Sequence, residues 1–388
     1  MLAAYRVVEL GAFVAGPGAG GVMADWGADV IKVETPSGDP MRRIFAVGSG
    51  HLQPQSPPFD LDNRGKRSVV LDLRSAGDRD NLNRLIGTAD VFLTNLRPDA
   101  VERLGLDHQT LLAAHPRLVY ASVTGYGLDG PDRLRPGYDV GAFNARTGLA
   151  NLQGEVFDEP ANIRSGLGDH VTSMTALTGI LAALLHRERT GKGQLVATSL
   201  LRAGIYSLGW DLGIQLRFDK LAPSQRRTEA ANPMINSYRG ADGKWFWLLG
   251  LEADRHWPNV VKALGEPAAL ADDRFADARG RRKNAADCIA ALDAIFATRS
   301  REEWTAIFDA HDVWWAPVQT PAEVLADPQA HAAGAFVDVP AGQGDSPAHR
   351  GIATPIDFSA APVTAGPVPA LGQHTAEVLA ELDNLSPR

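Results

Sequence analysis

The order of strand-like and helix-like segments predicts an α/β fold with an open, mostly parallel sheet. Residues 6–10 and 29–34 have the apolar, β-branched character of strands, and residues 16–26 between them have the small side chains of a closely packed helix. A strand–helix–strand order of this kind gives a parallel pair joined by a right-handed crossover. Further strands are expected at residues 68–73, 90–94 and 118–124, with a helix at 77–86. Strands that alternate with helices indicate a layered α/β domain.

Two more helices are expected after this sheet. Residues 171–187 carry apolar side chains at helical spacing, and basic residues followed by Gly191-Lys192-Gly193 mark the end of this helix. A second helix is predicted from about residue 197 to residue 216. The longest apolar stretch, residues 174–185, is too short and too rich in threonine to span a bilayer.

The pattern changes after Pro233, where a smaller domain is expected. Residues 237–239 and 245–249 flank the turn-forming residues 241–244, which predicts a β-hairpin with helical segments around it. Repeated prolines further on indicate an extended arm that ends in a helix at 374–382. The predicted division is a large domain with a linker helix, a small α+β domain, and a C-terminal arm that returns to the large domain, at residues 1–224, 225–325 and 326–388.

The composition excludes several classes of protein. The 38 basic and 46 acidic residues of this 388-residue chain give a net charge of −8, which disfavours attraction to nucleic acid or to an anionic membrane. The single cysteine, Cys288, excludes an intrachain disulfide and a cysteine-based metal site. Because the N-terminus enters a strand instead of a secretory signal, we expect a cytoplasmic protein.

The segment at residues 16–21, Gly-Pro-Gly-Ala-Gly-Gly, matches the GxGxxG pattern of dinucleotide-binding sites. In that motif the first glycine follows the strand directly, whereas here residues 11–15 separate the strand from Gly16. We therefore favour the interpretation that small side chains let this helix pack closely on the sheet. A helix N-terminus near an anion or a thioester oxygen is a further interpretation.

Asp169 is a candidate for a catalytic residue, although from its position alone a purely structural helix cap is the favoured interpretation. It stands in the segment 166–170, Gly-Leu-Gly-Asp-His, directly before the long apolar helix, where its carboxylate is expected to cap the helix and to stay ionised at neutral pH. The flanking glycines allow a bulky substrate to approach, and carboxylates act as covalent nucleophiles in some enzymes. His170 is expected to be packed or solvated and not to be a second catalytic group.

Basic residues are concentrated in the first 105 positions, several of them just after predicted strands. Loops at the carboxyl ends of parallel strands are where ligands bind in open α/β sheets. The arginine fork binds two phosphate oxygens at once, so the group is predicted to form a local positive site for a polyphosphate ligand. Its members are Arg42, Arg43, Arg64, Lys66, Arg67, Arg74, Arg97 and Arg103.

A series of short motifs runs in order over nearly the whole chain. These motifs are Arg6–Leu10 through Gly16-Pro17, Gly27–Glu34, Gly38–Arg42, Asn63–Ser68, Leu71–Leu73, Asn95–Pro98, Thr124–Gly127, Pro136–Asp139, Gly168-Asp169, Gly191–Gln194 and Leu371–Thr375. The ordered series resembles family III CoA-transferases. The resemblance implies a Rossmann-like large domain, a small domain, and a homodimer of two interlocked ring-like subunits. It also implies that Asp169 is the nucleophile. Carried over position by position, the residues expected along the CoA are Val14, Ala15, Leu71, Asp72, Leu73, Arg74, Asn95, Leu96, Arg97, Arg103, Pro136, Gly137, Tyr138 and Asp139.

The resemblance further implies a reaction between an acyl-CoA donor and a carboxylic acid acceptor. Attack by Asp169 on the acyl-CoA gives a mixed anhydride, and the released thiolate then forms an aspartyl-CoA thioester. An incoming carboxylate reverses these steps, so CoA and acyl-CoA act as substrates and neither ATP nor a metal is required. Backbone N–H groups near Val14 and Ala15, or at the start of the Asp169 helix, are expected to stabilise the oxyanions.

The sequence departs from the formate-type members of this family, which carry glutamine and glutamate where this chain has Val14 and Asp139. Their glycine-rich flap is also not found, which favours a more apolar acid, with Val14, Ile44, Phe143 and residues 232–236 as candidates for the acyl pocket.

Two alternative functions stay open. One is a 2-methylacyl-CoA racemase, although Tyr138 stands where its histidine would be and is a poor base near neutral pH. The other is a non-catalytic acyl-CoA-binding protein.

Overall fold

The computed structural model describes residues 1–44, 56–153, 159–160, 163–344 and 346–384, and the chain divides into two compact units. Unit 1 contains Met1–Asn151, Ala161–Leu221 and His331–Arg388. Unit 2 contains Leu152–Pro160 and Ala222–Ala330. No helix among these described residues is both long enough and apolar enough to cross a membrane.

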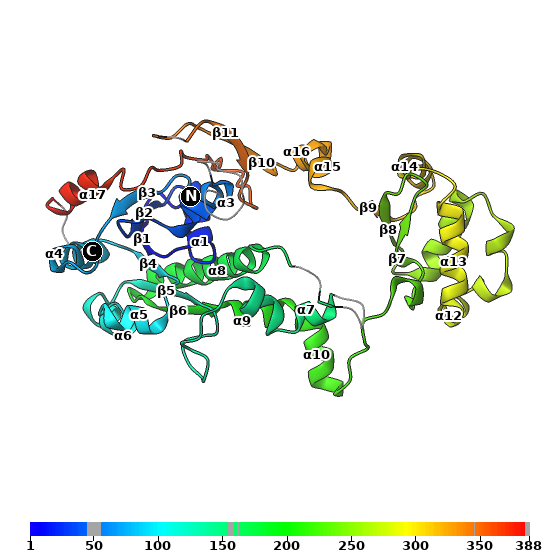
Figure 1. Ribbon diagram of the computed structural model, residues 1–388, viewed down its shortest axis with the longest axis horizontal. Coiled ribbons are helices and arrows are strands. Elements are labelled where there is room, and N and C mark those ends of the chain that lie inside the picture. Colours follow the sequence, from blue (N-terminus) through cyan, green and yellow to red (C-terminus); the bar gives the residue numbers. More distant parts are fainter. Residues whose placement is uncertain (45–55, 154–158, 161–162, 345, 385–388) are drawn as a thin grey trace. The chain divides into compact units, whose positions relative to one another are not determined.

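Unit 1 is built on a six-stranded, entirely parallel sheet (Figure 1). Its strands are β1 (Arg6–Leu10), β2 (Asp29–Glu34), β3 (Arg67–Val70), β4 (Val91–Thr94), β5 (Val119–Thr124) and β6 (Gln194–Ser199). Their order, β3-β2-β1-β4-β5-β6, is that of the doubly wound Rossmann-type fold. The predicted α/β fold is therefore confirmed. Strands β2 and β3 are added on one side of β1, and strands β4 to β6 are added on its other side. The point between β1 and β4 is therefore the switch point of the sheet. Ligands bind at such a point, outside the carboxyl ends of the strands.

Helices cover both faces of this sheet. The helices of unit 1 are α1 (Pro17–Asp25), α3 (Pro57–Asn63), α4 (Ala76–Gly87), α5 (Pro98–Arg103), α6 (His108–Ala114), α8 (Leu167–Thr190), α9 (Leu200–Ser207), α10 (Gly209–Phe218) and α17 (Thr375–Leu382). Of these, α3 packs on α1 and α10 follows α9, so neither forms a layer on the sheet. Alternate residues of β1 explain the two layers: Val7 packs in the cluster that contains α1 and α8, and Val8 packs in the cluster that contains α4 and α6. Burial on both faces is why these strands are apolar runs.

The sequence prediction differs from the structure at residue 197, which was expected to begin a helix. Residues 194–199 instead form the edge strand β6, and α9 and α10 follow. Ser199 marks the change, because its hydroxyl accepts a hydrogen bond from the Arg202 amide and caps α9. Gly193 allows the approach of β6 to β5, since a Cβ there would lie 1.9 Å from the Leu118 carbonyl oxygen. The C-terminal segment, expected to be an extended arm, contains an antiparallel pair, β10 (Phe336–Val339) and β11 (His349–Ile352).

Unit 2 combines a three-stranded antiparallel sheet with helices. The predicted hairpin is present as β7 (Ile235–Arg239) and β8 (Trp245–Leu249), and β9 (Trp315–Pro317) pairs with β8. Its helices are α11 (Ala253–Ala263), α12 (Ala278–Lys283), α13 (Ala285–Phe296), α14 (Arg301–Ala310) and α15 (Pro321–Ala326), while α7 (Leu149–Leu152) and α16 (Pro328–Ala332) lie where the chain passes between the units. An aromatic core that includes Phe246 and Phe296, 5.1 Å apart and edge to face, holds the unit together.

The glycines of α1 allow three elements to approach it closely. A Cβ on Gly18 would lie 2.6 Å from the Ser173 hydroxyl of α8, and one on Gly20 would lie 2.1 Å from the Glu9 carboxylate of β1. A Cβ on Gly21 would lie 2.6 Å from the backbone oxygen of Asp62 in α3. The packing interpretation of residues 16–21 is therefore confirmed.

We predict that Gly21→Ala destabilises unit 1, because the new methyl group meets backbone atoms that cannot rotate away. The expected loss is about 1–3 kcal/mol in the free energy of unfolding, measured by urea denaturation. Gly209→Ala is the matched control, because a Cβ at that position in α10 meets no heavy atom of the described residues within 4 Å beyond its chain neighbours and its own helix backbone. Equal stability of the two variants would contradict this account of α1.

Candidate active site

The loop between β1 and α1 lies at the switch point and is fixed by side chains from several elements. Asn95, just after β4, accepts a hydrogen bond from the Ala12 amide at 3.0 Å and donates one to the Ala12 carbonyl at 2.7 Å. The Phe13 amide donates to Asp39 at 3.2 Å, and Phe13 has a left-handed backbone with φ of 63°. From α8, the Ser173 hydroxyl donates to the Ala15 carbonyl at 2.9 Å. A non-glycine residue in this conformation is strained, and such strain is common at functional sites.

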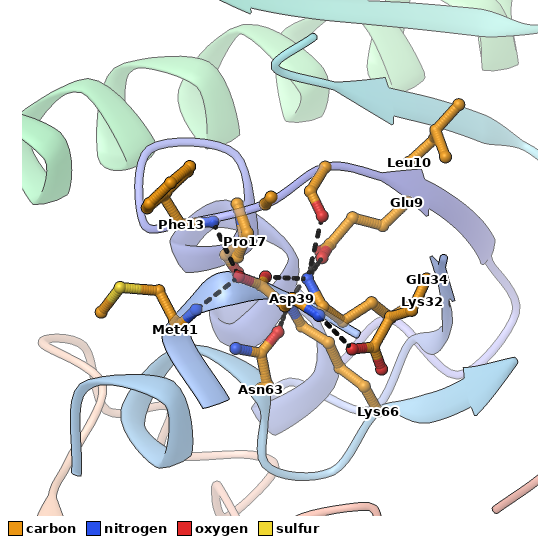
Figure 2. Close-up of polar contacts among 12 residues, drawn as sticks. Glu9, Leu10, Phe13, Pro17, Lys32, Glu34, Asp39, Met41, Asn63 and Lys66 are labelled. Carbon is orange, nitrogen blue, oxygen red and sulfur yellow. Dashed lines mark hydrogen bonds and ion pairs between the residues drawn. The ribbon is translucent and has the colours of Figure 1, made fainter. Parts of the chain in front are cut away.

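A buried ion network lies beneath the same loop (Figure 2). Lys32 and Lys66 converge on the two oxygens of Glu9 at 3.0 and 2.7 Å, and Lys32 also lies 2.9 Å from Asp39. Lys32 donates to the Gly11 carbonyl at one end of the loop, and Lys66 donates to the Pro17 carbonyl at the other. Burial alone would raise the pKa of Glu9, but the two lysines hold that pKa below its ordinary value. Burial also lowers the pKa of Lys66 to about 8.

Asp169 lies in the first turn of α8, but it is not the cap of that helix. Gly166, with φ of 98°, occupies the cap position, and its amide donates to the Asp139 carboxylate at 2.6 Å. Gly168 leaves room for Phe143, since a Cβ there would lie 2.4 Å from that ring. The sequence prediction of an N-cap at Asp169 is therefore wrong. The helix start is organised by Asp139 instead, and the half-buried Asp169 side chain is left to face a cavity.

The expectation that Asp169 stays fully ionised at neutral pH is also wrong. Burial, the nearby Asp139 and the more weakly acting Asp62 together raise the pKa of Asp169 to about 7, although His170 acts in the opposite direction. The helix N-terminus favours a carboxylate by only about 0.3–1 kcal/mol, which is less than desolvation and two like charges cost. Asp169 therefore divides between its neutral and ionised forms close to pH 7.

His170 forms a hydrogen bond with the buried carboxylate of Asp62, a contact that was not predicted from the sequence. Its Nε2 atom lies 3.1 Å from Oδ1 of Asp62, whose side chain is only 4% exposed. This hydrogen bond raises the pKa of His170 above its ordinary value, even though burial opposes it. Asp62 stands 108 positions earlier in the chain, at the end of α3, so no local motif could indicate the pair.

Asp169, His170 and Asp139 line one cavity of about 1060 Å³ within unit 1. Most of its wall is apolar. The apolar side chains are Phe13, Val14, Met41, Ile44, Pro57, Pro58, Leu61, Val140, Leu167 and Ile352. Val14 and Ile44 were predicted to line an acyl pocket, whereas Phe143 is buried against Gly168 and residues 232–236 belong to unit 2.

The residues predicted along the CoA fall into two groups. In the first group, Val14, Tyr138 and Asp139 line the cavity with Asp169. Ala15 lies in the loop between β1 and α1, and Asn95 holds that loop by hydrogen bonds to Ala12. The others lie at or beyond the ends of β3, β4, α5 and β5. They are Leu71, which is buried, the partly exposed Asp72, Leu73, Leu96 and Gly137, and the exposed Arg74, Arg97, Arg103 and Pro136.

The predicted basic group is also divided. Arg74, Arg97 and Arg103 are exposed, with aspartates as their recorded ionic neighbours. Four other members form ion pairs within the protein, so their charges already have partners there. These pairs are Arg42–Glu34, Arg64–Asp25, Lys66–Glu9, and Arg67 with Asp29, Glu377 and Glu381. Their physical role is to hold loops and helices onto the sheet.

Comparison with known proteins defines the class to which this site belongs. The model of CoA-transferase family III matches residues 2–375, so the chain belongs to this family. It is a CoA-transferase that acts on acyl-CoA and carboxylate substrates, and the resemblance seen in the sequence is confirmed. Within the described part of the chain, no cluster of three or more His, Cys, Asp and Glu side chains is arranged to hold a metal ion.

Two CoA-transferases and one crystal structure are similar to this chain over most of its length. The chain is 35% identical over 335 residues to cinnamoyl-CoA:phenyllactate CoA-transferase of Clostridium sporogenes, covering 86% of this chain and 81% of that enzyme. It is 30% identical over 387 residues to (R)-2-hydroxy-4-methylpentanoate CoA-transferase of Clostridioides difficile, covering 98% and 95%. The crystal structure of a CAIB/BAIF family protein from Brucella suis matches with a TM-score of 0.85 and 33% identity, over 98% of both chains.

We predict that Asp169→Asn stabilises the protein at alkaline pH. A carboxyl whose pKa is raised by folding binds more protons in the folded state, so its contribution to stability falls as pH rises from about 4 to about 7. A shift of this size corresponds to about 4 kcal/mol, which is roughly halved because the side chain is only half-buried. The amide carries no such ionisation cost, so the variant should exceed the wild type by about 2 kcal/mol at pH 8 and by little at pH 4. Thermal unfolding across this pH range is the measurement.

Asp80→Asn, an exposed change on α4, is the matched control for charge and should show no such trend. A stability difference between Asp169→Asn and the wild type that does not depend on pH would contradict the raised pKa of Asp169.

Proposed function

We propose that this protein is an acyl-CoA:carboxylate CoA-transferase that works through covalent intermediates at Asp169. The observation that supports this most strongly is the position of Asp169, half-buried on an apolar cavity beside the loop at the switch point of the sheet. A partly desolvated carboxylate is a stronger nucleophile than a hydrated one, because less hydration must be removed as it attacks.

The steps balance without water or net proton transfer. One oxygen of the Asp169 carboxylate bonds to the acyl carbon, the C–S bond breaks, and a mixed anhydride and the CoA thiolate result. The thiolate then bonds to the aspartyl carbonyl, which releases the donor acid as a carboxylate and leaves an aspartyl-CoA thioester. An acceptor carboxylate attacks that thioester, and the returning thiolate takes up the new acyl group.

The amides of Val14 and Ala15 are suitable donors for the oxyanions of these steps. Within the described part of the chain, neither N–H has a hydrogen-bond partner, whereas the neighbouring carbonyl oxygens accept bonds from Ser173 and Gly18. The loop is held from both sides, so its free amides have a fixed direction, which is what electrostatic stabilisation of a transition state requires.

The CoA is proposed to follow the predicted residues from Leu71 to Arg74, Asn95 to Arg97, Arg103, and Pro136 to Asp139. The exposed arginines at positions 74, 97 and 103 offer guanidinium groups to phosphates at the carboxyl edge of the sheet. For these arginines the phosphates would replace partly exposed aspartate partners, and ion pairs at a protein surface are weak in water.

The acid is proposed to be larger and more apolar than formate or oxalate. The cavity wall supports this, because its side chains are mainly aliphatic, aromatic and proline. The named activities of the two relatives above, on phenyllactate and on 2-hydroxy-4-methylpentanoate, agree with acids of this size. Burying an apolar acyl group in such a wall contributes about 25 cal/mol for each Å² removed from water.

The working enzyme is proposed to be an interlocked homodimer. In support, α9 and α10 carry large apolar side chains that are mostly exposed, with Tyr206, Trp210 and Leu216 at 87%, 83% and 88%. Apolar groups gathered in this way usually mark a surface that another chain covers.

A 2-methylacyl-CoA racemase is the second candidate, favoured by the acid–base properties of the site. An aspartate whose pKa is raised to about 7, next to a histidine, suits proton transfer at neutral pH. Tyr138, at the position expected for the second base, is 62% exposed and is a weak base. A non-catalytic acyl-CoA-binding protein lacks support, because the chain belongs to a family of enzymes.

We predict that an acyl-CoA substrate labels Asp169. The protein is incubated with a panel of acyl-CoAs, including succinyl-CoA and bulkier apolar thioesters, and is then treated with hydroxylamine or borohydride. Mass spectrometry should find the modification at Asp169 and the strongest labelling with apolar donors. Asp169→Asn should remain unlabelled and lose at least about 10³-fold in turnover, because the nucleophile is absent.

Asp139→Asn is the comparison variant, because it keeps an acceptor for the Gly166 amide and leaves Asp169 in place. It should still be labelled. Absence of label in the wild type, together with α-carbon deuterium exchange in a 2-methylacyl-CoA, would overturn the transferase and favour the racemase.

A further inference from the structure

We propose that His170, held by Asp62, is a positioning residue that supplies a fixed positive charge beside Asp169 during CoA transfer. The inference rests on the proposed function and adds a residue that was expected to be only packed or solvated. His170 and Asp169 are consecutive in the first turn of α8 and line the same cavity. Asp62 approaches from α3 and contacts the imidazole at 3.1 Å.

The place of Asp62 is fixed by packing and does not depend on the histidine. Its backbone lies against Gly21 of α1, where there is no room for a side chain, and its own side chain is almost fully buried. The Oδ2 atom of Asp62 has no hydrogen-bond partner among the described residues, and His170 is its recorded ionic partner. A buried carboxylate needs a cation close by, so Asp62 favours the protonated imidazole.

The groups around the pair show why it acts on Asp169. Asp139 is the other carboxylate that acts on Asp169, and it has the stronger effect of the two. Burial raises the pKa of Asp62, the hydrogen bond and charge of His170 and the charge of Lys66 oppose this, and Glu9 adds to it. The Gly166 carbonyl also favours the protonated form of His170. Other charged or titratable side chains that line the cavity are Arg64, Tyr138, Arg164, His349 and Arg350, of which Arg64 is paired with Asp25.

The reaction needs such a charge more than it needs a proton donor. Every group that attacks or leaves in the proposed cycle is an anion, either a carboxylate or a thiolate, so no proton changes hands. Each tetrahedral intermediate carries negative charge next to Asp169. A cation that is held in place before the reaction stabilises that charge without reorganising. It also favours the ionised, nucleophilic form of Asp169 over the neutral form.

The test compares His170→Gln with the wild type across the pH range. Removing the imidazolium leaves the carboxylates uncompensated, so the acid limb of the kcat/KM profile should move up by about 0.5 to 1 pH unit. Activity near pH 6 should then fall about 3- to 10-fold while activity near pH 9 changes less. His186→Gln, an exposed histidine on the same helix, is the matched control and should leave the profile unchanged.

Asp62→Asn completes a double-mutant cycle. Without the carboxylate of Asp62, the His170 imidazole is protonated less often near neutral pH. The shift that His170→Gln causes in the acid limb of the kcat/KM profile should therefore be smaller in the Asp62→Asn background. An equal loss of activity at all pH values, with the acid limb unmoved, would overturn the proposal and leave His170 a packing role.

A second readout does not require catalysis. The difference in thermal stability between a protein with Asp169 and its Asp169→Asn counterpart varies with pH and reports the ionisation of Asp169. The lower end of this variation is set by the unfolded state, and the upper end by the pKa of Asp169 in the folded protein. We expect the upper end to rise by about 0.5 to 1 pH unit in the His170→Gln background. An unchanged upper end would overturn the proposal. If the wild type shows no transferase activity while the upper end shifts, the proposed function fails and the charge role stands.

Discussion

The buried contact of Glu9 with Lys32 and Lys66 is the constraint on which the site depends. These ions come from β1, from β2 and from the segment before β3, and their side chains are fully buried. Burying charge is costly, and the cost is offset only when every partner is in place. The two lysines use their remaining donors on the carbonyls of Gly11 and Pro17. The network therefore joins the sheet to both ends of the loop beside the cavity.

Two features of the site are energetically unfavourable, and the packing of the rest of unit 1 holds them in place. Phe13 has a left-handed backbone, and Asp169 lies close to Asp139, whose carboxylate is committed to the Gly166 amide. Strained features of this kind persist only where the surrounding packing leaves no alternative conformation. The close approach of α1 to α3 and α8 provides that packing, and it is possible because glycine occupies the contact positions. In the proposed mechanism, the stability that is lost at Asp169 is linked to the reactivity of that carboxylate.

Local patterns predicted most of the sheet and the position of the candidate nucleophile. Five of the six strands of unit 1 were expected from apolar runs. Asp169 was singled out by its place near the start of the long helix and by the family resemblance, and its role as nucleophile stays a prediction. β6 was missed because its residues are half-exposed and run directly into α9, so the apolar pattern continues across the boundary. The Asp62–His170 pair could not be predicted, since it depends on tertiary packing between α3 and α8. The same holds for Arg64, which looked like a phosphate ligand but is buried against Asp25.

The most direct test of the central claim follows oxygen into Asp169. The protein is allowed to turn over an acyl-CoA with an ¹⁸O-labelled carboxylic acid acceptor, and the peptide that contains Asp169 is then weighed. In the proposed cycle one oxygen of the acceptor becomes the bridging oxygen of the anhydride and stays on Asp169 when the thiolate takes up the acyl group. The account predicts ¹⁸O in the Asp169 side chain after turnover. Formation of the new acyl-CoA without ¹⁸O at Asp169 would contradict it.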